Sequence, residues 1–187
     1  MQNTNISRKY EEYAYVLDFS TRHKSLTVPG REGTIITGLG EDRLTLLEIL
    51  GMPNSTFDIG ELIYIGKEGR TKVLSVLGKI NYNKISISAQ NELGAIVEKI
   101  VTKNEKKFVD YLNNAQPLTP RIHALELIPG IGKTYMKSML DEIKRKKFTS
   151  FNDLQERVGF KEPAKNIAKR IMDEITGKTR MNFFVKR

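Results

Sequence analysis

Hydrophobic side chains recur at every second position near the start of the chain, which is typical of a β-strand. The positions concerned are Tyr13, Tyr15, Leu17 and Phe19. Further strands are expected at residues 34–37, 62–65 and 72–77. The last two would form a hairpin around the glycine-rich turn between them, whereas residues 44–50 fit either a strand or a short helix. Several short strands in so short a stretch predict a small closed barrel or a sandwich.

From residue 93 onward the hydrophobic positions fall mostly three and four apart, which is typical of an amphipathic helix. The stripe consists of Leu93, Ile96, Val97, Ile100, Val101, Phe108, Val109 and Leu112. Ser86 and Ser88 are alternative N-caps for this helix, and a break is expected near Asn104. Residues 113–117 are expected to form a short connector, and we place the domain boundary there.

The remainder of the chain predicts helices. Thr119 followed by Pro120 fits the N-cap and first position of a helix that ends near Leu127. A second helix is expected to begin near Lys133, after an interruption at residues 128–132.

Two more helices follow. Ser150, with Asp153 three residues later, resembles a capping box that opens a short helix. The last helix carries a hydrophobic stripe and ends at Gly177. The stripe comprises Ala164, Ile167, Ala168, Ile171, Met172 and Ile175. Residues 180–187 contain an apolar run and are expected as a tail that returns to the barrel as a final strand.

Positive charge is concentrated in the C-terminal part of the chain. The formal net charge is +9 and the isoelectric point is about 9.6. Residues 1–116 contain 15 Lys and Arg against 14 Asp and Glu, whereas residues 117–187 contain 16 against 8. A uniform excess would indicate a solubilising surface, but localised basicity is typical of a protein that binds a polyanion.

The composition excludes several kinds of protein. The chain has no cysteine, which excludes disulfides, thiolate metal sites and cysteine nucleophiles. No segment approaches the roughly 20 continuous apolar residues that span a bilayer, and the polar residues 1–9 do not resemble a signal peptide. We therefore expect a cytoplasmic protein with no membrane partner.

Residues 127–134 carry the most informative motif, and two interpretations compete for it. Gly132, Lys133 and Thr134 match the end of a phosphate-binding P-loop, G-x-x-x-x-G-K-[ST]. That motif requires glycine where Leu127 stands, and it follows a strand, whereas a helix is expected here. No strand ending in a metal-binding Asp follows either, so we reject the P-loop.

The second interpretation is a helix-hairpin-helix, in which a tight glycine turn joins two helices. Gly130 and Gly132 would supply the positive φ and the close backbone approach that the turn needs, and Ile128 and Ile131 would anchor it. Backbone N–H groups of both glycines and of Lys133 would then face outward at a helix N-terminus, where anions bind. The alternative is a turn that only packs two helices together.

Residues 158–163 occupy the matching place in a second helix pair. They lack the Gly-x-Gly pattern, so we expect them to buttress the first hairpin rather than to bind phosphate strongly. Lysines near both hairpins add positive charge. The predicted nucleic-acid-binding residues are Gly130, Ile131, Gly132, Lys133, Thr134, Lys137, Lys161, Lys165 and Lys169. Their contacts would go to phosphate, so they position a nucleic acid without reading its sequence.

Other candidate clusters are better explained as structure. The aromatic residues of the first strand could stack on bases, but they are expected in the barrel core. His123 is expected to be packed or close to a phosphate rather than to bind a metal. The acidic pairs at 141–142 and 173–174 suggest a two-metal nuclease, but neighbouring basic residues favour a solvated helix face. The lone Gly-x-Gly at 38–40 is expected as a turn. We therefore predict no catalytic residue, no metal and no cofactor.

The chain resembles an archaeal family of unknown function with an N-terminal OB-like barrel and a C-terminal tandem helix-hairpin-helix domain. The resemblance extends from about residue 13 to residue 184. It rests on Tyr64 to Lys67, on Asn104, Glu105, Phe108, Val109 and Asn113 to Ala115, and on Arg121 to His123 with Glu126 to Lys133. It implies a nucleic-acid-binding protein with no established reaction. Genes of this family tend to lie beside genes for ribosomal RNA modification and transcription, which favours RNA.

We therefore expect an α+β protein in three parts. Residues 1–90 would form the OB-like β-barrel, residues 91–116 a connecting amphipathic helix and linker, and residues 117–187 the all-α tandem helix-hairpin-helix domain with its tail. The predicted function is non-enzymatic binding of phosphate backbone, foremost in structured RNA such as ribosomal RNA, with ribosomal proteins as candidate partners. The alternatives are a DNA-binding accessory protein of repair or recombination, an enzyme such as a nuclease or NTPase, and a protein-interaction adaptor.

Overall fold

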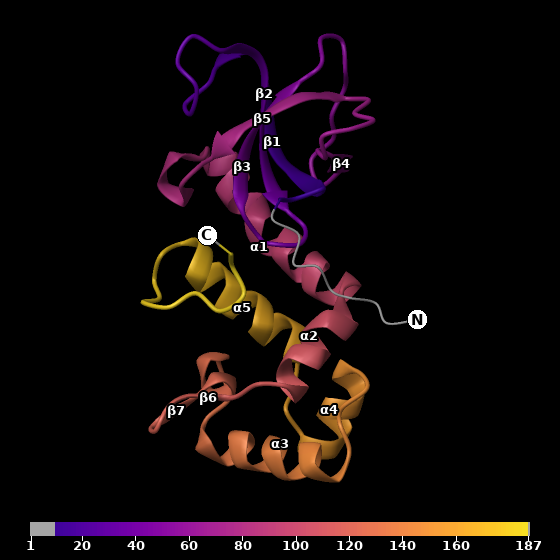
Figure 1. The fold of residues 1–187 in the computed structure, drawn as a ribbon, viewed down its shortest axis with the longest axis vertical. Helices are drawn as coiled ribbons and strands as arrows, with labels where there is room; N and C mark the ends of the chain where they lie inside the picture. The colour runs from indigo at the N-terminus through magenta and orange to yellow at the C-terminus, as the bar shows by residue number, and fades with distance from the viewer. Residues whose placement is uncertain (1–9, 187) are drawn as a thin grey trace. The chain divides into compact units, whose positions relative to one another are not determined.

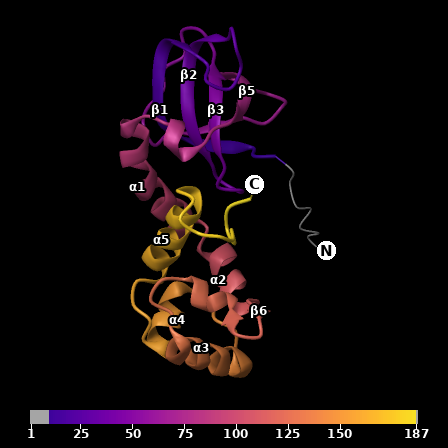
Figure 2. The same ribbon diagram turned by 90° about the vertical axis from the view of Figure 1, so that its left-hand side faces the viewer.

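A curled five-stranded sheet forms an antiparallel half-barrel in the N-terminal part of the computed structural model, which describes residues 10–186 (Figures 1 and 2). The strand order is β4-β1-β2-β3-β5, and every neighbouring pair is antiparallel. The strands are β1 (Tyr13–Lys24), β2 (Glu32–Gly40), β3 (Leu46–Gly51), β4 (Leu62–Tyr64) and β5 (Val73–Lys79). The predicted strands at 13–19 and 34–37 are thus confirmed, and the ambiguous segment at 44–50 lies mostly in a strand.

The predicted hairpin between residues 62–65 and 72–77 is wrong. β4 pairs with the start of β1, where Tyr13 lies opposite Tyr64, and β5 pairs with β3 at the other edge of the sheet. Arg70, between the two strands, donates hydrogen bonds to the carbonyl groups of Ile65, Gly66 and Leu74. A side chain therefore bridges the seam that a closed barrel would join by backbone pairing.

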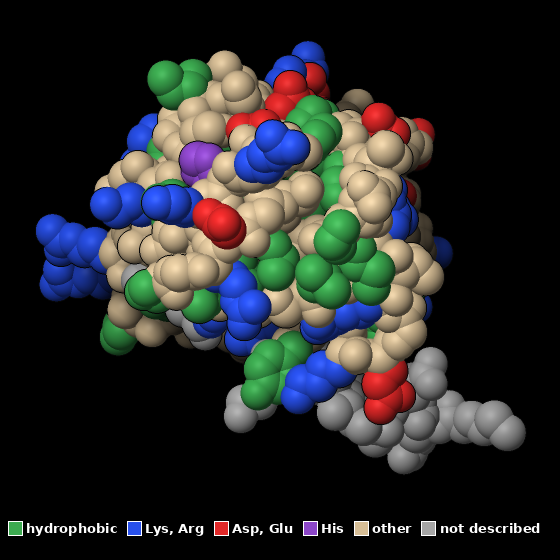
Figure 3. Space-filling view, turned by 90° about the horizontal axis from the view of Figure 1, so that it is seen from above, with side chains coloured by type: hydrophobic (Ala, Val, Ile, Leu, Met, Phe, Trp, Pro, Cys, Tyr) green, Lys and Arg blue, Asp and Glu red, His purple; other side chains and the backbone are tan. Residues whose placement is uncertain are grey.

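Side chains on both faces of β1 are buried. Ala14 and Val16 belong to a core cluster with residues of the other four strands and Phe57, while Tyr15 and Leu17 are equally inaccessible. Tyr15 is therefore a core residue, as expected, whereas Tyr13 is 40% exposed. Figure 3 shows hydrophobic side chains in several separate groups on one end of the molecule, with Lys and Arg between them.

The Gly-x-Gly at 38–40 lies within β2 and is not a turn. Glycine is needed there because a Cβ at Gly40 would lie 2.0 Å from the carboxylate of Glu11. That carboxylate is buried and accepts N–H groups of Asp42 and Arg43, which fixes the loop before β3. Burial raises the pKa of Glu11 above its ordinary value. The glycine pattern therefore serves a close side-chain approach.

Two helices follow the sheet, α1 (Ile87–Lys103) and α2 (Glu105–Asn113). Ser86 is the N-cap of α1, because its hydroxyl accepts the N–H of Ala89 at 3.0 Å. The predicted break falls at Asn104. Every residue of the predicted stripe from Leu93 to Leu112 is buried, so the amphipathic pattern is confirmed.

The predicted helix from residue 119 to residue 127 is wrong. Its place is taken by a small ribbon of two strands, β6 (Pro117–Thr119) and β7 (Ile122–His123), and one 3-10 turn, η2 (Ala124–Leu127). The Thr119 hydroxyl accepts the N–H groups of Arg121 and Ile122, which holds the chain in a reverse turn. A side-chain bond that favours a turn has therefore overridden the N-cap pattern.

Three helices complete the chain, α3 (Lys133–Arg145), α4 (Phe151–Val158) and α5 (Pro163–Ile175). They begin close to the predicted positions. The tail forms no strand within its described residues, but the N–H of Lys186 donates to the carbonyl of Arg43, so it returns to the sheet. Arg187 lies outside the described residues. Glu174 is 1% exposed and accepts N–H groups of the tail, so it does not lie on a solvated face as expected.

The chain divides into two compact units. The sheet unit comprises Met1–Ile96 and Glu174–Arg187, and the helical unit comprises Val97–Asp173. The division falls inside α1 and near the end of α5, which differs from the expected boundaries after residues 90 and 116. α2 lies in the helical unit, where its side chains bond to residues before and at the start of α4. The tail lies in the sheet unit, where it bonds to Arg43. Within the described residues no helix is long and apolar enough to cross a membrane.

Candidate nucleic-acid interface

The first hairpin, residues 128–132, is a tight turn that anchors itself in the helical unit. Ile128 and Ile131 are buried, and the N–H of Ile131 donates to the carbonyl of Ile128 at 3.1 Å. Gly130 has φ +86°, and a Cβ there would lie 3.2 Å from a ring carbon of Phe160. The predicted anchor residues and the need for glycine at position 130 are therefore confirmed.

Gly132 has a different role from the one predicted. It is the N-cap of α3 with φ −86° and ψ −173°, a conformation open to any residue. A Cβ at Gly132 would meet no other atom within 4 Å, and no side chain caps the helix. Glycine here leaves the approach to the helix end open rather than permitting a strained turn.

The first N–H groups of α3 point into this open approach. The first hydrogen bond of the helix joins the N–H of Met136 to the carbonyl of Gly132, so earlier N–H groups have no partner inside the helix. Within residues 10–186, the N–H groups of Lys133 and Thr134 have no acceptor. Together with the helix dipole they favour an anion.

Lys133 has a partner that the sequence did not suggest. Its ammonium lies 3.1 Å from the carboxylate of Glu126 and 3.3 Å from the carbonyl of Arg121, while 72% of its side chain stays exposed. Glu126 also accepts the N–H of His123, and that hydrogen bond, followed by the one from Lys133, lowers its pKa. Lys137 is exposed and forms no ion pair within the described residues. The negative charge of Glu126 therefore partly neutralises the positive charge of Lys133 at this site.

His123 is the N-cap of the turn η2 that leads into the first hairpin. Its Nδ1 accepts the N–H of Leu125 at 3.1 Å, and only 8% of the residue is exposed. Burial lowers the pKa of His123, so the neutral ring that can accept this bond is favoured. The expectation of a packed histidine is confirmed. Among the described residues no group of three His, Cys, Asp or Glu could hold a metal.

The second hairpin, residues 158–162, lies against the first. Gly159 ends α4 in the left-handed conformation, with φ +79°. The ring of the buried Phe160 meets that of Tyr135 from α3 edge to face, with centroids 5.5 Å apart. Asn166 donates to the carbonyl groups of residues 161 and 162, and its own oxygen would lie 3.5 Å from a Cβ at Gly130. The two turns therefore support each other, as predicted.

The start of α5 differs chemically from the start of α3. The first residue is Pro163, which has no N–H group, and Glu162 places a carboxylate directly before it. Lys165 pairs with that carboxylate at 3.3 Å, whereas Lys161 and Lys169 are exposed without an ion pair in the described chain. A negative group at the helix end disfavours a second anion.

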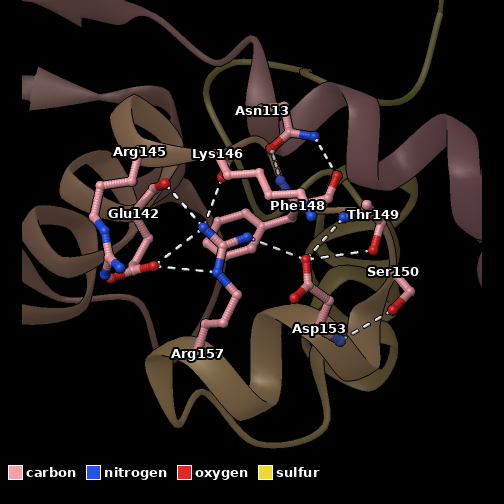
Figure 4. Close-up of polar contacts among 9 residues, drawn as sticks. All are labelled: Asn113, Glu142, Arg145, Lys146, Phe148, Thr149, Ser150, Asp153 and Arg157. Atoms are coloured by element: carbon pink, nitrogen blue, oxygen red, sulfur yellow. Dashed lines mark hydrogen bonds and ion pairs between the residues drawn. The ribbon is translucent and has the colours of Figure 1, made fainter.

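A dense polar cluster fixes the segment between α3 and α4 (Figure 4). Arg157 donates to the carbonyl groups of Glu142 and Lys146 and to the carboxylates of Glu142 and Asp153. Its guanidinium also lies 4.5 Å from the ring centroid of Phe148. The hydrogen bond from Arg157 is the main cause of the lowered pKa of Glu142. One cation thus ties α4 to α3, the helix that follows the first hairpin.

Asn113 holds the same segment from the side of α2. Its amide accepts the N–H of Phe148 and donates to the carbonyl of Phe148, both at 2.8 Å. Glu105 accepts the N–H of Phe151, the first residue of α4. The sequence places residue 113 in a connector and among the residues of the family resemblance but predicts no contact for it, because no local pattern signals a bond across 35 residues.

The sheet unit carries a second open surface at the seam that Arg70 bridges. The hollow has a volume of about 890 Å³. Its lining combines aromatic, basic and apolar side chains, among them Tyr10, Tyr64, Arg43, Lys67, Lys79 and Val76. Its acidic residues, Glu11, Glu12 and Glu68, nearly balance the cations. This surface therefore lacks a clear charge preference.

These features define a mixed α+β protein in which a curled half-barrel of five antiparallel strands accompanies a helical unit. In that unit the start of α3 is open and has no side-chain cap. Residues 10–186 match the family described as "Protein of unknown function (DUF655)", and the chain belongs to this family. It is 39% identical over 185 residues to the "Uncharacterized protein MJ0038" of Methanocaldococcus jannaschii, covering 97% of this chain and 83% of that protein. The crystal structure of Af1531 from Archaeoglobus fulgidus has a similar fold, with a TM-score of 0.81 and 36% identity, covering 94% of this chain and all of that one.

Proposed function

We propose that this protein is a non-enzymatic nucleic-acid-binding protein that holds the phosphate backbone of structured RNA at the start of α3. The observation that carries the proposal is the unoccupied set of N–H donors at Lys133 and Thr134, reached through the open space at Gly132. Backbone donors and a helix dipole recognise a phosphate but not a base. The binding is therefore independent of sequence.

Basic side chains near the helix end strengthen the proposal. Lys133 and Lys137 lie one helical turn apart, so both ammonium groups can contact the phosphates of one strand. The pairing of Lys133 with Glu126 holds its side chain beside the hairpin, and its 72% exposure leaves donors for a phosphate. The helical unit as a whole contains 16 Lys and Arg against 10 Asp and Glu.

The proposal includes two finer assignments. We assign the helical unit to the tandem helix-hairpin-helix class, because two glycine turns with positive φ each precede a helix and pack against each other. We assign the sheet unit an OB-like role as a second contact, supported by its five curled strands and partly open seam. The preference for RNA, ribosomal RNA in particular, and for ribosomal proteins as neighbours follows from the family resemblance.

The test is a binding titration with a folded RNA at several salt concentrations. Two phosphate contacts predict that affinity falls about tenfold between 50 and 200 mM salt. Lys133→Glu adds a negative charge at the helix end and should weaken binding about tenfold or more. Lys144→Glu, at the other end of the same helix about 16 Å away, makes the same charge change and should have a much smaller effect.

Three results would change the conclusion. Equal losses in the Lys133 and Lys144 variants would mean that only net charge matters and would remove the hairpin from the mechanism. Stronger binding to duplex DNA than to folded RNA in direct competition would favour the repair accessory. Absence of binding to either nucleic acid at low salt would refute the proposal.

A further inference from the structure

Residues 117–122 of the β6–β7 ribbon form an exposed projection outside the core. Residues 117–122 are all exposed, including the apolar side chains of Leu118 and Ile122, at 36% and 43%. In Figure 1 the ribbon projects from the rest of the helical unit. These apolar side chains are therefore exposed to solvent in the folded protein.

The tip of the ribbon is exposed and is held by hydrogen bonds to a side chain within the turn. The Thr119 hydroxyl accepts the N–H groups of Arg121 and Ile122 at 3.2 and 3.0 Å. Pro120 fixes φ at the first inner position of the turn. At the base, His123 is buried and starts the capped turn η2. A preorganised tip loses little conformational entropy when it binds.

The only charged side chain of the ribbon is positive and free. Residues 117–122 contain no acidic residue, and Arg121 is exposed with no side-chain partner among the described residues. A surface that joins apolar groups to one unpaired guanidinium suits a nucleic-acid groove, where the guanidinium can donate to 2′-hydroxyl and phosphate oxygens and apolar groups can contact sugars.

The ribbon lies next to the open end of α3. The ammonium of Lys133 is 3.3 Å from the carbonyl of Arg121. The side chain of Lys133 therefore contacts the ribbon tip, while the backbone N–H groups of Lys133 and Thr134 form the open helix end. A nucleic acid whose phosphate occupies the helix end would present its adjoining groove to the ribbon.

We propose that the β6–β7 ribbon enters the minor groove of a double-helical segment whose backbone is bound by α3. In this arrangement the side chain of Arg121, at the ribbon tip, contacts the groove. This inference rests on the proposed function and adds that the preferred ligand is a duplex rather than a single strand. The minor groove follows from the shape of RNA. The major groove of an A-form helix is too deep and narrow for side chains, whereas the minor groove is wide and shallow.

The test compares an RNA duplex of about 16 base pairs with its separated strands. Arg121→Ala should weaken duplex binding about five- to tenfold, because a groove contact is lost. It should change single-strand binding less than twofold, since a single strand offers phosphates but no groove. The matched control is Lys144→Ala, which removes one exposed positive charge from the other end of α3 and should affect both ligands equally. Thermal melting checks that each variant is folded.

The outcomes separate the inference from the proposed function. Equal weakening of duplex and single-strand binding by Arg121→Ala would reduce Arg121 to a phosphate contact and overturn the inference alone, as would no change on the duplex. Capture of a protein that requires Arg121, with duplex binding unaffected, would also overturn it. Failure of the unmodified protein to bind any nucleic acid would overturn both.

Discussion

The two hairpins have the same outline but differ where an anion would sit. Each contains a glycine with positive φ, at Gly130 and Gly159, and each leads into a helix of 13 residues. α3 begins with an open glycine cap and free N–H groups, whereas α5 begins with Glu162 and Pro163. The two turns therefore share a backbone outline, and they differ in the residues at the cap and first helical position.

The second hairpin also packs against the first. The second turn supplies Phe160 and Asn166, which pack against Gly130 and hold the first turn in place. The proposed function assigns phosphate binding to the first turn and a supporting role to the second. It can be tested by changing one residue at a time at matched positions.

The largest expected effect distinguishes the two glycines of the first hairpin. Gly130→Ser should destabilise the helical unit by about 2 kcal/mol, because a side chain there is strained at positive φ and is crowded by Phe160. Gly132→Ser should leave stability unchanged or slightly higher, since serine is a good N-cap. Its hydroxyl would occupy the free N–H groups and weaken RNA binding about fivefold.

Chemical denaturation and a binding titration on the same samples check this pair of variants. If Gly132→Ser binds RNA as tightly as the unmodified protein, the N–H groups of α3 are not the phosphate site. If Gly130→Ser is as stable as the unmodified protein, the close packing of the two turns has no energetic consequence.

A smaller effect should appear when the second hairpin is made more like the first. Glu162→Gly removes the carboxylate before α5 and suits a position where φ is +49°. We expect RNA affinity to rise about two- to threefold, because repulsion at the helix end is lost. Stability should not fall. The control Glu156→Gln removes a charge from exposed α4, and an equal gain there would attribute the effect to net charge.

The smallest expected effect is the contribution of His123, at the first hairpin, to the pH dependence of stability. Burial holds the pKa of His123 below its ordinary value of 6.5. The unfolded chain therefore takes up this proton first, and the free energy of unfolding should fall as pH drops below about 6.5. The cap before the second hairpin is Ser150, which does not titrate. Lowered carboxylate pKa values, such as that of Asp153, act only at more acidic pH.

Denaturation curves between pH 7 and pH 5 measure this effect. His123→Asn keeps a side-chain acceptor for the N–H of Leu125 but cannot take up a proton. The variant should therefore be less sensitive to pH than the unmodified protein over this range. Equal slopes for the two proteins would mean that His123 does not contribute.

Local sequence signals predicted local structure well. The cap at Ser86, the break at Asn104 and the start of α3 at Lys133 each depend on residues within one helical turn. Ser150 also caps α4 as predicted, although Asp153 bonds to the N–H of Thr149 rather than completing the capping box. Such contacts can be read from spacing because the partners are neighbours in the chain.

The errors and omissions share a physical cause. Residues 119–127 matched the pattern of a helix start. The hydrogen bonds that Thr119 accepts within its own turn stabilise a reverse turn instead. The spacing of residues alone does not show which of these two local structures is more stable. β4 pairs with β1 because of sheet geometry, and Glu174 is buried because the tail bonds to it. Asn113, Arg157 and the pairing of Glu126 with Lys133 depend on segments that only the folded chain brings together. The candidate site was therefore predicted by motif, and its supporting contacts were not.

The bridge that Arg70 makes across the open seam has a consequence for how the protein behaves in a crowded solution. An incomplete barrel leaves two strand edges, and free carbonyl groups at an edge can accept a strand from another molecule. Arg70 occupies three of these acceptors, at Ile65, Gly66 and Leu74, with a single charged group. These three carbonyl groups are therefore not available to pair with a strand of another molecule.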